Sequence, residues 1–502
     1  MAATSTPNHF VIIGAGPVGL LAALALRKHC PAAATKISIY ERRPNLEQSL
    51  EESYPIGVSP RGLRALKEIS PAAFEQVQTT GALVNSWDIY GGNRQVAQVQ
   101  SGTTLGHTRF SVMDALYQQV EKTSPAIDVH FGTKLTALDI KHQSLTLMEE
   151  STHKETKVDC SHALVIACDG ANSTTRRLLV GNCDAQQDPS YTPTRHVTTP
   201  WGIYFRVLFM DSVEDPMTVP LDPNSHSIYN GCYCAITGPS NGQRKWIVAL
   251  ASKKYDDHGD WFFVDSKEPT SEQMTTLRQF IADRIPPLAP DTAQYFSDDE
   301  IKAFFTRRQF TGNLVSLAPL HYPHNFHAEA KQSASTNPPW LLFLGDSAHS
   351  VFPATGEGLN SGLDDVLQFA KTVLTPASSS SGTMDIAAFT ASRQTDVDAL
   401  ANLANEILSA SNGPPQVRVT NLITLIVSSM ARKVGILGPS EAELRYGPQT
   451  SLTNLMAYRD VWKRHVADTK WIRKVAGIMV SIGFSIFSWI PTSSRSTQGR
   501  KE

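Results

Sequence analysis

The sequence predicts an α/β fold in which a parallel sheet carries an inserted sheet-rich domain and is followed by C-terminal helices. Apolar runs at residues 10–13, 163–167 and 340–344 each end in a turn that carries Gly or Asp, and each suits a buried parallel strand. Between these runs, aromatic and β-branched stretches such as 201–210 and 245–252 are bounded by Gly, Pro and Asn, which is typical of strands in a second sheet.

The composition is that of an ordinary globular protein. The chain has 502 residues, of which 41% are hydrophobic and 18% charged, so it is long enough for two or three packed units. A formal net charge of −2 argues against a general nucleic-acid binder. The six cysteines are scattered without the spacing of a zinc site, so the sequence predicts no metal and favours a reducing, intracellular compartment.

The first glycine motif, GAGPVG at 14–19, has the layout of a phosphate-binding turn. Gly14 permits a tight turn, Gly16 allows backbone to approach a pyrophosphate, and Gly19 lets the following helix pack on the strand. The N-terminus of that helix adds unpaired N–H groups and partial positive charge. The next strand, 36–40, ends in Glu41, whose carboxylate can accept hydrogen bonds from an adenosine ribose.

Two further strand ends carry the same kind of residue. The run 163–167 leads into CDGANS at 168–173, and the run 340–344 leads into Gly345 and Asp346. Because the carboxyl ends of parallel strands meet at one ligand crevice, we expect the three turns to lie together. The glycine fingerprint by itself leaves NAD and FAD open as the dinucleotide.

Taken together, the three segments resemble the FAD-dependent aromatic hydroxylases, the single-component flavin monooxygenases. GAGPVG with Glu41, then CDGANS, then GDSAHSVFPATGEGLN at 345–360 match the ordered fingerprints of that family over the first three-quarters of the chain. The resemblance implies a Rossmann-like FAD-binding domain, with the second segment near the pyrophosphate and Asp346 on a ribitol hydroxyl. It also implies that the helix starting near Asn360 points its positive N-terminus at the flavin ring.

The cofactor-binding residues that this resemblance predicts are Gly14, Ala15, Gly16, Pro17, Val18, Gly19, Glu41, Arg42, Arg61, Asp169, Gly170, Gly345, Asp346, Pro353, Gly356, Gly358, Leu359 and Asn360. Within the third segment, the proline and the two glycines would let backbone approach the isoalloxazine. His349 is expected to pack or hydrogen-bond beside the flavin rather than to act as a base. No catalytic residue and no metal ligand is assigned.

A closer resemblance, to the kynurenine 3-monooxygenases, rests on IGVSPRGLRALKEI at 56–69 and SLTNLMAYRDVWKRH at 451–465. It places Arg61 near the flavin. Two arginines of that family are missing, however. One is expected near Met113, where Arg109 is the nearest arginine, and the other, which holds the substrate carboxylate, is expected within 81–90. Because a buried carboxylate without a cation is costly, the sequence leaves the substrate open.

The chain divides into four predicted parts. The FAD-binding domain comprises 7–75, 158–180 and 335–375, and the inserted substrate domain comprises 76–157 and 181–334. A helical region at 385–470 and a membrane-associated helix at 471–491 follow. Residues 475–490 carry no charge and reach about 24 Å as a helix, which makes a full span borderline, and the flanking tryptophans and basic residues favour a membrane. A buried core helix is the alternative.

The resemblance therefore implies an FAD-dependent, NADPH-consuming monooxygenase that hydroxylates an aromatic small molecule through a C4a-hydroperoxyflavin, with NADPH bound only transiently. A kynurenine 3-monooxygenase likeness would place it at the mitochondrial outer membrane. No second dinucleotide fingerprint or Cys-x-x-Cys is evident, which argues against a disulfide reductase. Two alternatives stay open: a membrane-associated flavoprotein reductase or cyclase acting on an isoprenoid or lipid, and a degenerate, non-catalytic flavoprotein. The sequence does not predict an oligomeric state.

Overall fold

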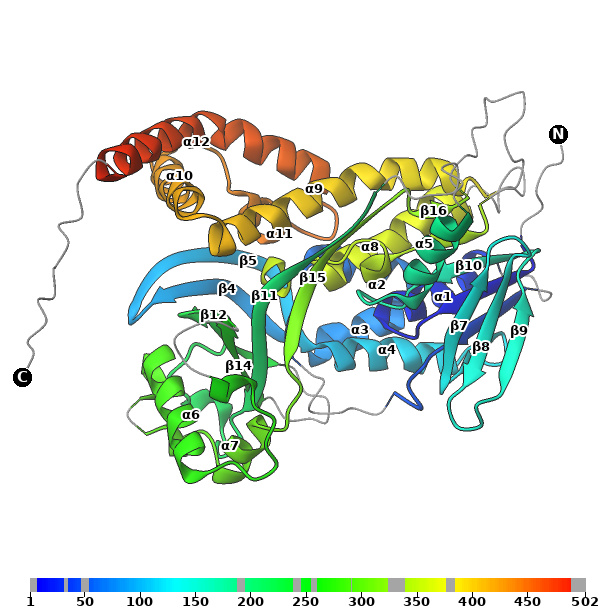
Figure 1. Ribbon diagram of the computed structural model, residues 1–502, viewed down its shortest axis with the longest axis horizontal. Helices are drawn as coiled ribbons and strands as arrows, with labels where there is room; N and C mark the ends of the chain where they lie inside the picture. Colours follow the sequence, from blue (N-terminus) through cyan, green and yellow to red (C-terminus); the bar gives the residue numbers. More distant parts are fainter. Residues whose placement is uncertain are drawn as a thin grey trace, which may run out of the picture.

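The structure is a computed structural model that describes residues 7–30, 35–46, 54–186, 195–237, 245–253, 260–289, 291–323, 339–375 and 384–488. Its described strands form a six-stranded, an eight-stranded and a three-stranded sheet. Figure 1 shows the six-stranded and three-stranded sheets toward the end of the molecule that holds the N-terminus, with the eight-stranded sheet beside them and the C-terminal helices across one side.

The first sheet has the strand order β16-β17-β10-β1-β2-β6. Strand β1 is parallel to both β10 and β2, and Ile13 pairs with Ala167 on one side and Tyr40 on the other, so the carboxyl ends of these strands are level. Its strands are β1 (His9–Ile13), β2 (Lys36–Tyr40), β6 (Ile127–His130), β10 (Ala163–Ala167), β16 (His321–Tyr322) and β17 (Leu341–Phe343). Because both faces are covered, β10 is buried at every position, as the apolar run predicted.

Helices pack on the first sheet and on one another. They are α1 (Pro17–His29), α2 (Pro60–Ile69), α3 (Pro71–Thr80), α4 (Arg109–Glu121), α5 (Thr174–Gln186) and α8 (Gly358–Phe369). The first three each begin with a proline, whose fixed φ and missing N–H suit the first helical position. Helix α1 lies against both α4 and α8, so it is buried along most of its length.

The three-stranded sheet consists of β7 (Thr133–Asp139), β8 (Ser144–Glu149) and β9 (Glu155–Asp159), and β7 contacts α5. It shares an apolar cluster with the first sheet, in which Leu145 and Val165 are fully buried. Strand β6 lies inside the range predicted for the inserted domain, yet it pairs with β2 of the first sheet. Its sequence, IDVH, is half polar, so apolar runs give no sign of this pairing. The domain boundaries stay a prediction.

The second sheet has the order β15-β11-β14-β13-β12-β4-β5-β3. Its strands are β3 (Pro55–Val58), β4 (Ala82–Gly91), β5 (Arg94–Thr108), β11 (Arg195–Phe209), β12 (Ser225–Tyr229), β13 (Cys232–Thr237), β14 (Lys245–Lys253) and β15 (Phe310–Ala318). One face packs on α6 (Ser271–Arg284) and α7 (Asp298–Phe304) in a cluster that includes Cys232 and Cys234. The opposite face carries Phe205 and Ile247, which pack with Phe352 of the third sequence segment.

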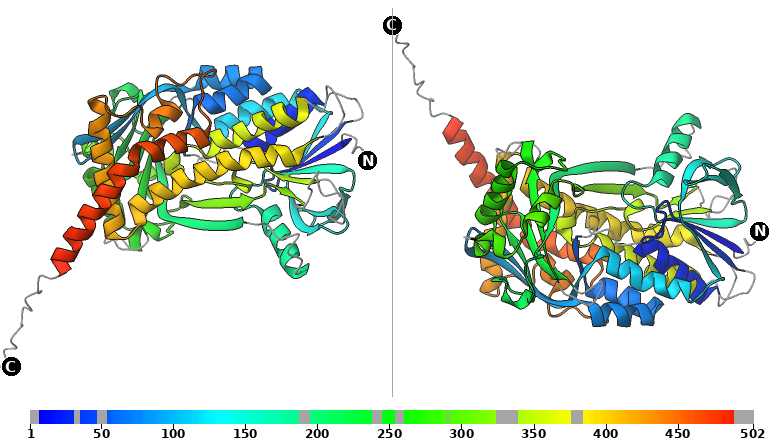
Figure 2. Two further views of the ribbon diagram at one scale, coloured as in Figure 1. Left: turned by 90° about the horizontal axis from the view of Figure 1, so that it is seen from above. Right: turned by 90° about the horizontal axis from the view of Figure 1, so that it is seen from below.

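Four helices complete the fold: α9 (Ile386–Asn412), α10 (Pro415–Lys433), α11 (Glu441–Tyr446) and α12 (Tyr458–Ser488). Helix α12 packs on α9 and α10, and its last turns project from the body of the molecule (Figure 2). Within the described part of the chain, no helix is both long and apolar enough to cross a membrane. Residues 489–491 of the predicted membrane-associated helix lie outside the described residues.

Short single-turn helices complete the described secondary structure. The 3-10 helices are Pro216–Thr218, Asp260–Phe263, Pro286–Leu288, Thr292–Gln294, Gly345–Ser347 and Pro353–Thr355, and a π-helical turn at Ala370–Leu374 extends α8. Two of the 3-10 turns fall in the third sequence segment. Both turns precede α8, which begins within the same segment at Gly358.

Candidate active site

The first segment forms the turn between β1 and α1. Gly14 has φ of +104°, and a Cβ there would lie 2.6 Å from the Cys168 carbonyl oxygen. A Cβ on Gly19 would collide with the Gly14 carbonyl oxygen, so neither position accepts a side chain. Gly16 differs, because the closest atom to its Cβ position is a guanidinium nitrogen of Arg109 at 3.6 Å. Protein atoms therefore leave no room for a side chain at Gly14 and Gly19. Beside Gly16, where the motif predicts a phosphate, the space is open.

Glu41 follows β2 and is buried beside the same turn. Its Oε2 accepts the Ala15 N–H at 2.8 Å, and its Oε1 accepts the Arg43 N–H at 2.9 Å and Nε at 3.0 Å. Burial alone would raise the pKa of Glu41, but the hydrogen bonds and charge of Arg43 outweigh burial, so the pKa is lowered. Glu41 is thus a carboxylate at neutral pH. Arg42 is exposed, and Arg43, which the sequence did not single out, makes the contact.

The second segment follows β10. Asp169 Oδ2 accepts both the N–H and the hydroxyl of Thr175 at 2.9 Å, so this oxygen caps the start of α5. Its other oxygen, Oδ1, is buried without a hydrogen-bond partner among the described residues. Gly170 has φ of +79° with open space around its Cβ position, so backbone conformation rather than crowding requires the glycine. A buried, unpaired carboxylate oxygen is the kind of acceptor that a bound ligand satisfies.

In the third segment, the half-buried carboxylate of Asp346 lies between two buried neighbours. Asp346 retains accessible surface while Gly345 and Ser347 do not, and no described residue hydrogen-bonds to its carboxylate. Burial raises the pKa of Asp346, with the positive charge of Arg109 opposing that rise. Gly345 has φ of +62°, and its N–H donates to Asp365 at 2.7 Å.

The loop before α8 exposes Pro353 and Gly356, and Gly356 adopts φ of +67°. The Asn360 side chain holds this loop in place through hydrogen bonds. Its Oδ1 accepts the Ser59 N–H, and its Nδ2 donates to the carbonyls of Gly57 and Gly356, each at 2.9 Å. The Asn360 side chain therefore has protein partners at both polar atoms, and it connects α8 to β3.

Within the same segment, Gly358 and Leu359 are half-buried at the first turn of α8. Glu357, one residue before the helix, is buried; it accepts the Tyr458 hydroxyl at 2.6 Å and pairs with Arg445 at 3.2 Å. The Tyr446 hydroxyl donates to the Thr355 carbonyl at 2.6 Å. The loop is thus held by residues of the C-terminal region, for none of which a role was predicted from the sequence, although Tyr458 lies in the stretch 451–465.

Arg61 and His349 both have structural partners. Arg61 is buried, pairs with Asp364 at 3.3 Å and lies over the Tyr458 ring at 4.0 Å, so it is not a solvated side chain. The position of Arg61 near the flavin remains a prediction. His349 Nε2 lies 2.6 Å from Asp365 Oδ2, with both side chains buried, which matches a hydrogen-bonding role.

The structure brings the three sequence segments together. Gly14 meets Cys168, a Cβ on Gly345 would lie 3.0 Å from the Val18 side chain, and a Cβ on Gly358 would lie 3.6 Å from Asp346 Oδ1. Arg109, whose role the sequence left open, reaches Gly16, and its charge acts on Asp346. A guanidinium thus lies at the mouth of the turn where the sequence predicts a pyrophosphate.

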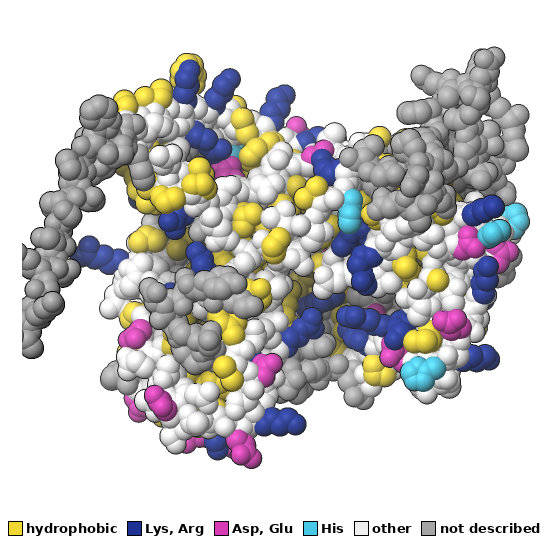
Figure 3. All heavy atoms as spheres, in the orientation of Figure 1, with side chains coloured by type: hydrophobic (Ala, Val, Ile, Leu, Met, Phe, Trp, Pro, Cys, Tyr) yellow, Lys and Arg dark blue, Asp and Glu magenta, His cyan; other side chains and the backbone are white. Residues whose placement is uncertain are grey.

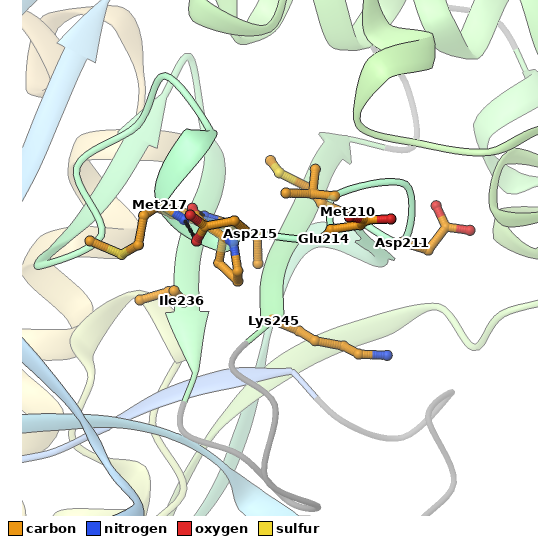
Figure 4. Close-up of a pocket in the computed structure, with 10 residues that line it drawn as sticks. Met210, Asp211, Glu214, Asp215, Met217, Ile236 and Lys245 are labelled. Carbon is orange, nitrogen blue, oxygen red and sulfur yellow. Dashed lines mark hydrogen bonds between the residues drawn. The ribbon is translucent and has the colours of Figure 1, made fainter.

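A separate surface pocket lies in the second sheet (Figure 4). Asp211, Glu214 and Lys245 are among its lining residues. Met210 and Trp246, which also line it, belong to the cluster that packs on α6 and α7. This pocket is therefore on the face of the sheet opposite Phe205 and Phe352, and it contains none of the predicted cofactor-binding residues.

Comparison with known proteins agrees with this geometry, although no family model matches the chain. Kynurenine 3-monooxygenase from Saccharomyces cerevisiae is 26% identical over 381 residues, covering 71% of each chain. The enzyme from Drosophila willistoni is 24% identical over 362 residues, covering 71% of this chain and 70% of the relative. The predicted resemblance is confirmed.

Solved structures support the same fold. A mutant of 2-methyl-3-hydroxypyridine-5-carboxylic acid oxygenase superposes with a TM-score of 0.56 at 16% identity, covering 83% of this chain and 96% of that one. CtdE, solved in complex with FAD, gives a TM-score of 0.54 at 15% identity, covering 80% and 93%. The fold class predicted from the sequence, a Rossmann-like α/β fold with an inserted sheet-rich domain, is confirmed.

Proposed function

We propose that this chain is an FAD-dependent, NADPH-consuming monooxygenase that hydroxylates an aromatic small molecule. One observation carries the proposal: three glycine- or aspartate-bearing turns, far apart in the sequence, meet at the carboxyl ends of β1, β10 and β17. That edge is where doubly wound sheets bind dinucleotides. The similarity to kynurenine 3-monooxygenases over most of the chain supports this class of chemistry.

The residues at this edge fit FAD. The turn at Gly16 is open to a pyrophosphate, and the N-terminus of α1 and the Arg109 guanidinium provide positive charge for it. Glu41 offers carboxylate oxygens to a ribose. Asp346 has no hydrogen bond from a described residue, and Asp169 has a buried oxygen without one, so both can accept from ligand hydroxyls. When bound, FAD supplies hydride acceptance and oxygen activation.

The chain's own residues hold and tune the ring. The exposed Gly356 leaves its backbone accessible, and α8 directs its positive N-terminus toward the same loop. Glu357 at that terminus would oppose the positive charge, but Arg445 neutralises it across 3.2 Å. The Tyr446 and Tyr458 hydroxyls fix the loop further. These contacts hold the loop on which the ring would lie.

Kynurenine is the first compound to test as the substrate, because the relatives are named kynurenine 3-monooxygenases. We expect addition of kynurenine to the FAD-loaded protein to accelerate NADPH oxidation, with oxygen consumed and a hydroxylated product formed in equal amounts. A panel of other aromatic ketones, phenols and aromatic acids is the control. If kynurenine is inert and another compound works, the reaction class stands and the substrate changes. If no compound stimulates oxygen uptake, the monooxygenase proposal fails, and lipid or isoprenoid substrates are tried next.

We further propose that the protein associates with a membrane, and the surface of α10 and α12 supports this. Large apolar side chains are exposed at helical spacing on both helices: Leu422, Leu425, Ile426, Met430, Trp471, Val475, Ile478, Met479 and Ile482. Basic residues accompany them, with Arg432 and Lys433 at the end of α10 and Lys474 over the Trp471 ring. Figure 3 shows hydrophobic and basic side chains together at this end of the molecule. This pattern is typical of a helix pair that lies on an anionic lipid surface.

Replacing Leu425 and Met479 with glutamate should lower binding to vesicles that contain anionic lipid by roughly tenfold or more, because each substitution removes about 1.5–3 kcal/mol of apolar burial. Cosedimentation of the full chain with vesicles measures the effect. Val96→Glu is the matched control, because Val96 is 65% exposed on β5 and belongs to neither helix. If the double variant sediments as the parent does, the proposed lipid contact is wrong.

A further inference from the structure

The second sheet carries a polar cluster on the face directed toward the flavin loop. Trp87 on β4 pairs directly with His226 on β12, and Tyr233 lies on the adjacent strand β13. Tyr233 packs against the cluster that contains Phe352, whereas its neighbours Cys232 and Cys234 pack toward α6 and α7. The three polar side chains therefore share the face that looks toward the candidate cofactor site.

Tyr233 is the centre of this cluster. Its hydroxyl forms a hydrogen bond with His226 Nδ1. The Trp87 and Tyr233 rings both pack edge-on against the His226 ring, with centroid distances of 6.2 Å and 5.3 Å. These contacts hold the His226 ring in place.

The His226 side chain is neutral and points its other nitrogen into the protein. Only 1% of its surface is exposed, and burial lowers the pKa of His226 to about 3. Its Nε2 has no hydrogen-bond partner among the described residues. A buried N–H without an acceptor is a rarer and costlier defect than an unused lone pair, so the proton belongs on Nδ1. His226 then donates to the Tyr233 oxygen.

Because the Tyr233 oxygen accepts from His226, the Tyr233 proton is directed elsewhere. Burial raises the pKa of Tyr233, so the side chain is a neutral phenol at neutral pH. Unlike His226, Tyr233 is only half-buried and keeps some accessible surface. Trp87 connects this point to the flavin loop, because its ring lies 4.9 Å from that of Tyr446, whose hydroxyl binds the Thr355 carbonyl.

We propose that Tyr233 donates its hydroxyl proton to an oxygen conjugated with the substrate's aromatic ring, such as the carbonyl of an aryl ketone. Trp87 and His226 are positioning residues that aim this hydrogen bond. The inference rests on the proposed function for the claim that an aromatic substrate lies between this face and the flavin loop. It adds the chemical group that is recognised and the residue that recognises it.

The same neighbourhood disfavours a carboxylate at this point of the substrate. Arg445 lies over the Tyr446 ring at 4.7 Å, but its guanidinium is already paired with both Glu357 and Glu441. Freeing it would leave two carboxylates, one of them fully buried, without their cation. A neutral oxygen acceptor matches a neutral phenol donor without that cost.

The experiment compares two probes on the FAD-loaded full chain by calorimetric titration. 2′-Aminoacetophenone carries a ring-conjugated carbonyl, and 2-ethylaniline is the same molecule with that carbonyl replaced by methylene. One added neutral hydrogen bond should make the ketone bind roughly five- to tenfold more tightly. Tyr233→Phe should abolish the preference by weakening only the ketone. Tyr229→Phe is the matched control and should keep the preference, because Tyr229 stacks on Tyr90 within the cluster on the opposite face.

His226 is tested by rescue. His226→Leu should remove the preference, whereas His226→Asn, which keeps a donor near the place of Nδ1, should restore part of it at equal thermal stability. Equal binding of the two probes to the parent, binding of neither, or a preference retained in Tyr233→Phe would each overturn the inference. The outcomes separate it from the proposed function: oxygen-dependent NADPH oxidation without a ketone preference removes only the Tyr233 role, and a Tyr233-dependent preference without turnover removes only the monooxygenase.

Discussion

Replacing Arg393 with methionine should lower the free energy of unfolding by about 3–5 kcal/mol, because two buried carboxylates would lose their shared cation. Arg393 Nε lies 2.7 Å from Asp365, and Nη1 lies 3.0 Å from Asp364. All three side chains are at most 3% exposed. Methionine fills much of the same volume, so the loss would come from the missing cation rather than from a void, although Asp364 would still be paired with Arg61.

The effect should extend to the candidate active site. Asp365, which Arg393 holds, also accepts the Gly345 N–H at 2.7 Å and the His349 ring at 2.6 Å. Burial alone would raise the pKa of Asp365, but the charges of His349 and Arg393 outweigh burial and lower the pKa to about 2. A lowered folded-state pKa contributes stability above the unfolded value near 3.9, and this stability is lost as pH falls toward 2.

Urea unfolding at pH 7, followed by circular dichroism, measures the first effect, and repeating it between pH 5 and 2 measures the second. In Arg393→Met the pKa of Asp365 should rise toward its unfolded value, so the pH window in which acid removes stability should narrow and the loss between pH 5 and 2 should be smaller than in the parent. Arg459→Met is the matched control, because Arg459 is 47% exposed beside Asp396 and should cost less than about 1 kcal/mol. A cost for Arg393→Met no larger than for this control would contradict the argument.

The sequence predicted those structural features that depend on residues close to one another in the chain. Gly14 and Gly19 are recognisable because a turn between a strand and a helix leaves no room for Cβ atoms there, and the structure shows both collisions. The strand 163–167 is recognisable because burial on both faces removes polar residues from it. The same reasoning places Asp346 directly after such a strand, and therefore at the edge where ligands bind.

The residues that the sequence missed act over long separations. Glu357 meets Arg445 and Tyr458, which lie 88 and 101 residues further along the chain. Nothing near any of them signals the pairing, because an ion pair between distant elements depends on the tertiary fold. Trp87 and Tyr233 are similar cases. Alternation along a strand indicates which residues share a face, but not that β4 pairs with β12 in the register that joins Trp87 to His226.

Replacing Asp346 with alanine should weaken FAD binding by roughly 10- to 100-fold, because hydrogen bonds that a charged carboxylate makes to ligand hydroxyls contribute about 1.5–3 kcal/mol. No described residue hydrogen-bonds to this carboxylate, so the protein itself gives it no structural partner of that kind. Flavin retained through gel filtration and the quenching of flavin fluorescence on titration measure the effect. Asp128→Ala is the matched control, since the Asp128 side chain is 56% exposed and its carboxylate pairs with the His130 side chain.

The stability of the flavin-free protein separates a ligand-binding aspartate from a structural one. Burial raises the pKa of Asp346, so the folded chain holds that proton more tightly than the unfolded chain does. Stability contributed by this group therefore falls as pH rises through the window between the unfolded and folded pKa values, and the charged form destabilises the fold at pH 7. Asp346→Ala should consequently unfold at the same or a higher urea concentration than the flavin-free parent at pH 7, while binding FAD less tightly. A variant that loses both flavin and stability would instead show that Asp346 supports the fold, and the ribitol assignment would fall with it.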